Sequence, residues 1–187
     1  MRTVNVSIGD FLQANQRATV IQLIPYLLQG GQSGYKLLST IAACQRLFFD
    51  SPDGIQYIGG SYLVWYKPNQ KGEANWNRAG CKNYTVAEYV NCILGGSVSR
   101  PDINTLVSLL KGGLSQDVVL VVAFDTELDK RVIVDGCKRA VALALIARQS
   151  LGEFVKLLNS SFSITVMELK SRLAHVLYPC DFFNSCP

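Results

Sequence analysis

The chain of 187 residues has little histidine, little charge and no long apolar run. A single histidine, and no Cys-x-x-Cys pair among six cysteines, argue against a structural zinc site. Because no run of 18 apolar residues occurs, no transmembrane helix is expected, and the first residues resemble a strand rather than a signal peptide. We therefore expect a cytoplasmic protein that makes no contact with a membrane.

Charged residues make up only 17% of the chain, whereas hydrophobic residues make up 49%. This composition excludes a disordered chain and provides enough apolar side chains for one large domain. The net charge of +4 is smaller than that of proteins dedicated to packaging DNA. The low charged fraction also favours a partly covered surface, either in a homo-oligomer or against another partner.

The cysteines and the single histidine are interpreted one by one, because they form no metal-ligand pattern. Cys44 and Cys92 lie in apolar helical patterns that are typical of small core residues. Cys180 and Cys186 bracket a short aromatic tail and could close a small loop, although an ordinary cytosol would keep them reduced. His175 lies in a helical pattern and is interpreted as a structural residue.

Hydrophobic periodicity and turn residues predict an α+β domain. The expected strands lie at 3–8 (half-buried), 55–66 (a pair, or one strand with a bulge at its glycines), 117–124, 131–134 and 163–167. The expected helices lie at 11–29, 35–49, 85–94, 101–112, 137–148, 150–158 and 168–177. Capping signals support two of them: Thr85 and Glu88 match a capping box, and Pro101 suits a first turn. A turn is expected at Ser51–Gly54.

The polar loop 67–82 is the nearest feature to a boundary within the chain. We expect a single domain over 1–187, in which this loop joins an N-terminal region (residues 1–66) to a C-terminal region (residues 83–187). Cations near aromatic residues can bind backbone phosphates and stack bases. The candidates for nucleic-acid binding are therefore Lys67, Lys71, Arg78 and Lys82. The alternative is a solvated surface loop anchored by a tryptophan.

The most informative segment runs from Val132 to Ala140, where a short β-branched strand ends in Asp-Gly and a helix begins at once. The free N–H groups and the positive dipole end of a helix start favour an anion at such a point. Gly136 permits an unusual backbone angle and the close approach of a ligand. Lys138 and Arg139 add positive charge, and Arg139 can hold a phosphate through two parallel hydrogen bonds.

Two further residues of this segment are candidates for catalysis. Asp135 can cap the helix, act as a base or bind a metal ion. The Cys137 thiol lies at a helix start beside two cations, which favours the thiolate and makes it reactive. Three nearby carboxylates could supply a base or hold magnesium: Asp125, Glu127 and Asp129. The alternative is a helix start that binds no ligand, whose cations point to solvent or pair with these carboxylates.

The same segment resembles the ParB/sulfiredoxin-like superfamily, in which a hairpin leads into a Gly-x-x-Arg turn, a small-residue helix and a short strand. Sulfiredoxins have a Gly-Cys-His-Arg turn, which Gly136-Cys-Lys-Arg139 approaches. Free-serine kinases and other archaeal members have Asp-Gly-His-His-Arg, and partition proteins have Gly-Glu-Arg-Arg. The histidine usual before the arginine is Lys138 in this chain. The resemblance is specific over 135–143, extends in outline over 117–167, and does not reach 30–115.

The resemblance implies a ParB/sulfiredoxin-like α+β fold, with a small mixed sheet, flanking helices and a largely helical insertion. It also implies that the turn binds nucleotide phosphates or a comparable anion, with ATP or ADP and magnesium as cofactors. Cys137 stands where sulfiredoxins have their catalytic cysteine. Three functions remain open: a nucleotide-binding enzyme or switch that transfers phosphoryl groups or hydrolyses NTP, a nucleic-acid-binding protein of partition type, and a non-enzymatic interaction protein on the same fold.

Overall fold

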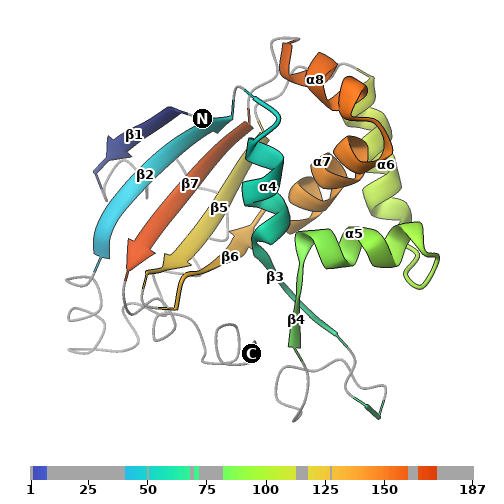
Figure 1. Cartoon of the computed structure of the whole chain (residues 1–187), viewed down its shortest axis with the longest axis horizontal. Helices are drawn as coiled ribbons and strands as arrows, with labels where there is room; N and C mark the ends of the chain where they lie inside the picture. The colour runs from blue at the N-terminus through green and yellow to red at the C-terminus, as the bar shows by residue number, and fades with distance from the viewer. Residues whose placement is uncertain are drawn as a thin grey trace.

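The computed structural model describes residues 2–7, 41–49, 51–67, 70–71, 82–112, 118–126, 128–159 and 164–171. Its strands are β1 (Arg2–Val6), β2 (Ile41–Phe49), β3 (Tyr62–Lys67), β4 (Lys82–Thr85), β5 (Val118–Asp125), β6 (Lys130–Asp135) and β7 (Ile164–Ser171). Its helices are α4 (Gly54–Gly60), α5 (Val86–Leu94), α6 (Pro101–Lys111), α7 (Cys137–Gln149) and α8 (Leu151–Asn159). The strands form one seven-stranded mixed sheet in the order β1-β2-β7-β5-β6-β3-β4 (Figure 1).

The predicted hairpin of two apolar strands is confirmed. β5 and β6 are antiparallel neighbours, and β5 pairs in parallel with β7 on its other side. Val121 and Val122 point to opposite faces of β5, and both are buried. The continuous apolar run at 117–124 therefore marks an inner strand, as such runs do in sheets covered on both faces.

The helix predicted at 35–49 is wrong over its described residues, because 41–49 form strand β2. Leu47 and Phe49 are buried and Phe48 between them is only partly buried, which agrees with the period of two of a strand and not with the spacing of a helix. The backbone of β2 pairs with β1 on one side and with β7 on the other. These distant partners, which no local pattern reveals, decide the conformation of the segment.

The strand pair predicted at 55–66 is only half correct. Residues 54–60 form helix α4, and the glycines interpreted as a bulge lie at its end. Only the second half is extended, as β3. The turn before α4 is confirmed, with the Gly54 N–H donating to the Ser51 carbonyl oxygen at 3.3 Å.

Corrections also apply at both ends of the chain. β1 is present as predicted, but its side chains are exposed except for a partly buried Val6. The strand predicted at 163–167 continues to Ser171 as β7, so the helix predicted at 168–177 is wrong over 168–171. The helix predicted at 11–29 lies outside the described residues, as do residues 172–187 with His175 and both C-terminal cysteines.

The predicted helices α5, α6 and α8 are confirmed, the first two at local capping signals. Thr85 and Glu88 form a complete capping box at the start of α5: the Thr85 hydroxyl oxygen accepts from the Glu88 N–H at 3.2 Å, and the Glu88 carboxylate accepts from the Thr85 N–H at 2.8 Å. α6 begins at Pro101 and is followed by Gly112. α8 covers the range predicted at 150–158.

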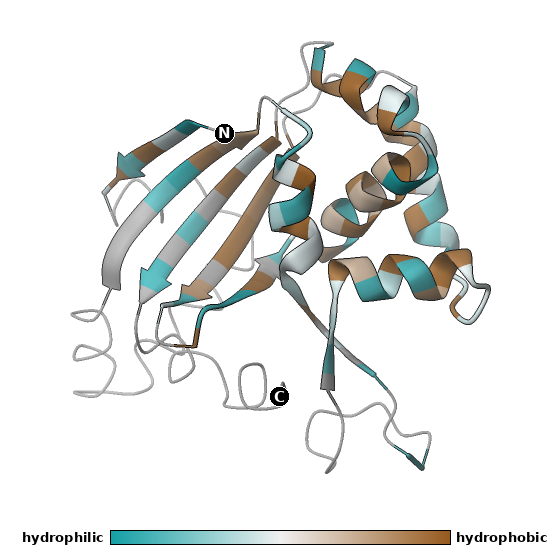
Figure 2. Ribbon diagram, viewed as in Figure 1, coloured by the Kyte–Doolittle hydropathy of each residue, from teal (hydrophilic) through white to brown (hydrophobic). Residues whose placement is uncertain are grey.

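Helix α7 lies at the centre of the helical layer, in contact with α4, α5, α6 and α8 (Figure 1). Its buried residues are Cys137, Ala140, Val141, Ala142, Leu143, Ala144, Leu145 and Ile146. Figure 2 shows β5 as mostly hydrophobic, whereas β7 carries hydrophilic residues toward its end. The core therefore lies between α7 and one half of the sheet, and the far half of β7 extends beyond it.

Strands from both sides of the loop 67–82 enter the same sheet. β3 and β4 flank the loop and are antiparallel, with Lys67 opposite Lys82. The two predicted regions, N-terminal (1–66) and C-terminal (83–187), thus share one sheet, and their division into domains stays a prediction. Among the helices that the structure describes, none has the length and apolar character needed to cross a membrane.

Candidate functional site

The β6–α7 turn (residues 135–139) has the strand–glycine–helix backbone that the sequence predicts. Gly136 lies between the two elements with a φ of 87°. A Cβ atom at Gly136 would lie 2.7 Å from a side-chain atom of Leu120 and 3.2 Å from the carbonyl oxygen of Val119. The turn needs glycine both for its left-handed backbone angle and for its close packing on β5.

The Asp135 carboxylate contacts two donors of the β6–α7 turn. One of its oxygens accepts a hydrogen bond from the Gly136 N–H at 2.7 Å, and the other lies 3.1 Å from the Arg139 Nη2 atom. The first turn of α7 contains no acidic residue of its own. The negative charge favoured by this helix start is therefore supplied by the preceding aspartate.

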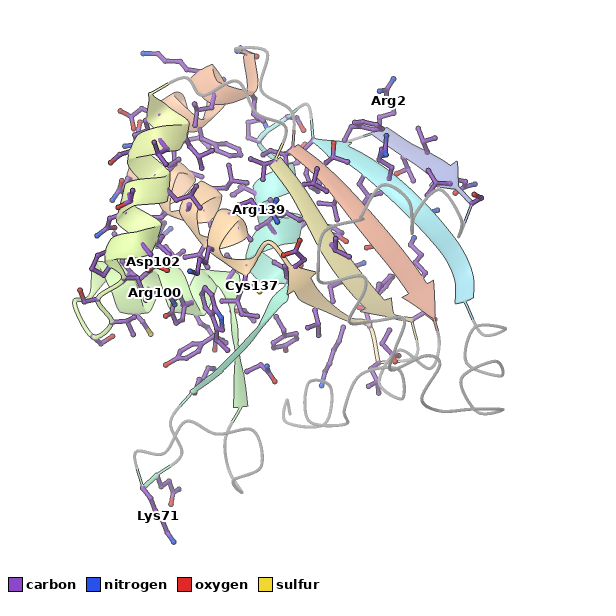
Figure 3. The ribbon with its side chains drawn as sticks, turned by 180° about the vertical axis from the view of Figure 1, so that it is seen from behind. Arg2, Lys71, Arg100, Asp102, Cys137 and Arg139 are labelled. Carbon is purple, nitrogen blue, oxygen red and sulfur yellow. The ribbon has the colours of Figure 1, made fainter. Side chains whose placement is uncertain are left out.

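Lys138 points to helix α6 and not to the Asp135–Arg139 pair. Its Nζ atom lies 2.9 Å from the Asp102 carboxylate, which also accepts two hydrogen bonds from Arg100 at 2.9 and 2.8 Å. The Arg100 guanidinium lies over the Trp65 ring, 4.5 Å from its centroid, and donates to the Tyr89 hydroxyl oxygen at 3.0 Å. Figure 3 shows Arg100 and Asp102 beside the start of α7. Lys138 thus ties α7 to α6.

This network predicts how stability responds to acid. Hydrogen bonds from Arg100 and then Lys138 hold the pKa of the Asp102 carboxyl well below its ordinary 3.8. A carboxylate whose pKa is depressed by folding stabilises the fold above that ordinary value, and the contribution is lost as the pH falls below it. Melting curves from neutral to acidic pH should therefore show a smaller acid loss in Asp102→Asn than in the parent. Asp129→Asn removes an exposed carboxylate as the control, and equal acid losses in all three proteins would contradict the prediction.

The Cys137 thiol is less accessible than its place at a helix start suggests. It is buried and donates a hydrogen bond to the Ile133 carbonyl oxygen at 3.2 Å. Cys92, predicted to be a core residue, is instead partly exposed on α5. Cys44 lies in strand β2 rather than in a helix. The burial of Cys137 removes the exposure on which its predicted reactivity depends.

A mild alkylating agent should therefore modify Cys92 faster than Cys137, the reverse of the order that the sequence favours. The reason is access, since the agent reaches a partly exposed thiol without opening the core. Mass spectrometry after brief labelling measures both rates, and labelling in denaturant should abolish the difference. Faster labelling of Cys137 in the folded protein would show that the β6–α7 turn opens.

Two of the carboxylates suggested as partners of the turn, Asp125 and Asp129, lie near the other end of β6. β6 runs about 16 Å from Lys130 to Asp135, at roughly 3.3 Å per residue, and Asp129 lies before its first residue. Asp125 is buried and accepts from the Leu128 N–H at 2.9 Å. The structure thus separates both from the turn, and Glu127 lies outside the described residues. Within the described ranges, no group of three or more His, Cys, Asp or Glu side chains converges to hold a metal ion.

The cations predicted to bind nucleic acid do not gather at the β6–α7 turn. Lys67 ends β3, and its Nζ atom lies 2.6 Å from the Glu88 carboxylate. Lys71 lies far from the turn, at the tip of the connection between β3 and β4 (Figure 3). Lys82 begins β4, and Arg78 lies outside the described residues. Lys67 is therefore already paired within the protein.

A second charged group, which sequence reasoning missed, lies near the opposite end of β6. We call it the Glu168 cluster: Tyr57, Phe124, Arg131, Glu168 and Lys170. Lys170, Phe124 and Arg131 stand in one row across β7, β5 and β6. Glu168 precedes Lys170 on the same face of β7, and α4 brings Tyr57 over it, so that the Tyr57 hydroxyl donates a short hydrogen bond to Glu168.

Glu168 is a buried carboxylate, with a side chain only 2% exposed. Lys170 Nζ and Arg131 Nε lie 3.5 and 3.6 Å from its two oxygens. Burial, and then the adjacent Glu168 charge, raise the pKa of Tyr57 strongly, so the tyrosine remains a neutral donor. A buried charge needs such partners. The sequence signal was two charged residues continuing the alternation of Ile164 and Val166, which the predicted helix at 168–177 concealed.

Comparison of the chain with protein-family models, with curated proteins and with solved structures finds no match. The resemblance to the ParB/sulfiredoxin-like superfamily therefore stays a prediction that rests on the local motif.

Proposed function

We propose that this protein binds a small phosphate-bearing molecule at the β6–α7 turn, with ATP or ADP as the ligand that the local resemblance suggests. The observation that carries the proposal is the position of the Asp135 carboxylate. The Gly136 N–H and the Arg139 guanidinium converge on it at 2.7 and 3.1 Å. Donors that hold a carboxylate at a helix start suit phosphate oxygens as well.

In this proposal Asp135 is an internal competitor of the ligand. A phosphate displaces its carboxylate, and Arg139 turns from the aspartate to the phosphate. Lys138 stays on Asp102 and keeps α6 against α7. The local resemblance of residues 135–139 to the anion-binding turn of the ParB/sulfiredoxin-like superfamily also motivates the proposal. No chemical step is assigned, because Cys137 is buried.

Calorimetric titration with ATP and with ADP, each with and without magnesium, tests the proposal. Arg139→Ala removes a charge-assisted contact and should weaken binding by about tenfold to a hundredfold. Asp135→Asn keeps the size of the side chain but removes its charge, and should strengthen binding. Arg148→Ala, an exposed arginine at the far end of the same helix, is the matched control and should bind as the parent does.

Absence of nucleotide binding in both the parent and Asp135→Asn would overturn the proposal. It would leave the second candidate, a non-enzymatic interaction protein, which one observation favours. All three charged side chains of the turn already have partners within the protein, since Asp135 pairs with Arg139 and Lys138 pairs with Asp102. The nucleic-acid-binding alternative stays a prediction, for which a steep fall of DNA affinity with salt is the test.

A further inference from the structure

We infer that the Glu168 cluster is a second ligand site, distinct from the β6–α7 turn, which takes a small oxyanion through Arg131 and Lys170. The ligand class is a carboxylate or a phosphate group. The two sites lie near opposite ends of β6, so one can be tested without the other.

The first argument is charge. Two cations face a single carboxylate, because Arg131 and Lys170 both lie beside Glu168. Glu168 also accepts a hydrogen bond from the Tyr57 hydroxyl, so its charge is stabilised by two cations and one donor. Among the described residues, the further ion pair of the cluster is weak, since Asp129 lies 3.9 Å from Arg131 with a side chain 84% exposed, where water and salt screen it. The cluster therefore keeps an excess of positive charge.

The second argument is an unsatisfied donor. The Arg131 Nε atom is buried and has no hydrogen-bond partner. Its distance of 3.6 Å from the Glu168 oxygen exceeds that of a hydrogen bond. A buried N–H without an acceptor in the protein is rare, and an ordered water or a bound anion can satisfy such a group. Phe124 fixes the guanidinium in place, because the Arg131 Cζ atom lies 3.9 Å from the ring centroid.

The third argument is position. The row Lys170–Phe124–Arg131 lies toward the carboxyl ends of the parallel strands β5 and β7. Open sheets with parallel strands commonly bind ligands beside such ends. Neighbouring strands are about 4.8 Å apart, so the backbones carrying the two cations lie roughly 10 Å apart, a span that their long side chains close around a small anion. The Arg131 and Lys170 side chains are 31% and 29% exposed, which leaves both accessible.

Titration of the folded protein with inorganic phosphate, and separately with succinate, tests the inference at low ionic strength. We expect saturable binding of at least one of the two anions, and the comparison shows which group the site prefers. Lys170→Met should weaken that binding about tenfold, whereas Glu168→Gln should strengthen it by removing the competing charge. Lys111→Met is the matched control, because Lys111 is a similarly exposed lysine that pairs with Glu153 at 2.7 Å.

Arg139→Ala separates this site from the proposed nucleotide site, because it leaves the Glu168 cluster intact and should keep the binding of the small anion. Arg131→Gln should also lose binding of the anion. If this variant does not fold, the result for Lys170→Met alone tests the inference. Two results would overturn the inference: no saturable binding of either anion to the parent, or equal weakening in Lys170→Met and Lys111→Met. Either result would mean that the two cations serve only to neutralise Glu168.

Discussion

Gly136→Ala is expected to lower the free energy of unfolding by about 2–5 kcal/mol, because two costs add at this position. The φ of 87° lies in the left-handed region, which costs a residue with a Cβ roughly 1–2 kcal/mol. The new Cβ would also lie 2.7 Å from the Leu120 side chain, and overpacking of a core costs about 1–3 kcal/mol. Unfolding by urea, followed by circular dichroism, measures the loss.

Two other glycines separate these costs. Gly96 has a φ of 73° but nothing within 4 Å of the position that a Cβ would occupy, so Gly96→Ala should show the backbone cost alone. Gly60 has neither a positive φ nor a close neighbour, so Gly60→Ala should leave stability within about 0.5 kcal/mol of the parent or raise it slightly. If Gly136→Ala costs no more than Gly96→Ala, the close packing of the β6–α7 turn on β5 is contradicted.

Phe154→Ala is expected to cost about 3–5 kcal/mol of stability, the usual effect of removing a buried aromatic side chain. Phe154 anchors α8 to the core with a side chain only 1% exposed. Folded domains are stable by only about 5–15 kcal/mol, so this variant should lose a large fraction of the total. A fall in the urea midpoint with an unchanged slope measures a loss of stability alone.

Leu151 provides the matched control on the same helix. It is 54% exposed, so Leu151→Ala should change stability by less than about 0.5 kcal/mol. A similarly small effect of both substitutions would show that α8 does not pack against α7 and α6 as the structure places it.

Several elements could be predicted from the sequence because short-range signals specify them. The capping box of Thr85 and Glu88 begins α5, and Pro101 begins α6. The backbone N–H groups of a first helical turn have no partner within the helix, so a nearby side chain must accept their hydrogen bonds, or a proline, which has no N–H, must take the position. The β5–β6 hairpin joins strands that are neighbours in the chain, so its pairing requires no distant partner. Gly136 between strand and helix likewise marks a local backbone requirement.

The residues of the candidate site could be predicted from the sequence, but their side-chain contacts and burial could not. Residues 135–139 indicate an anion-binding turn, and the backbone has the predicted form. That Asp135 itself occupies the donors depends on side-chain placement, and the burial of Cys137 depends on how α7 packs against the other helices. The position of Lys138 depends on Asp102 of α6, which only the tertiary packing brings near.

By itself, the sequence determined the locally capped helices, the glycine turn and the one hairpin. The tertiary structure alone decided that 41–49 and 168–171 are strands, because their pairing partners lie far away in the chain and strand preference depends on such partners. The tertiary structure also forms the Glu168 cluster, because the members of the cluster come from four separate elements. The parallel pairing of β5 with β7 and the position of α4 over β7 bring a tyrosine, two cations and a carboxylate together. No spacing of residues along the chain predicts this arrangement.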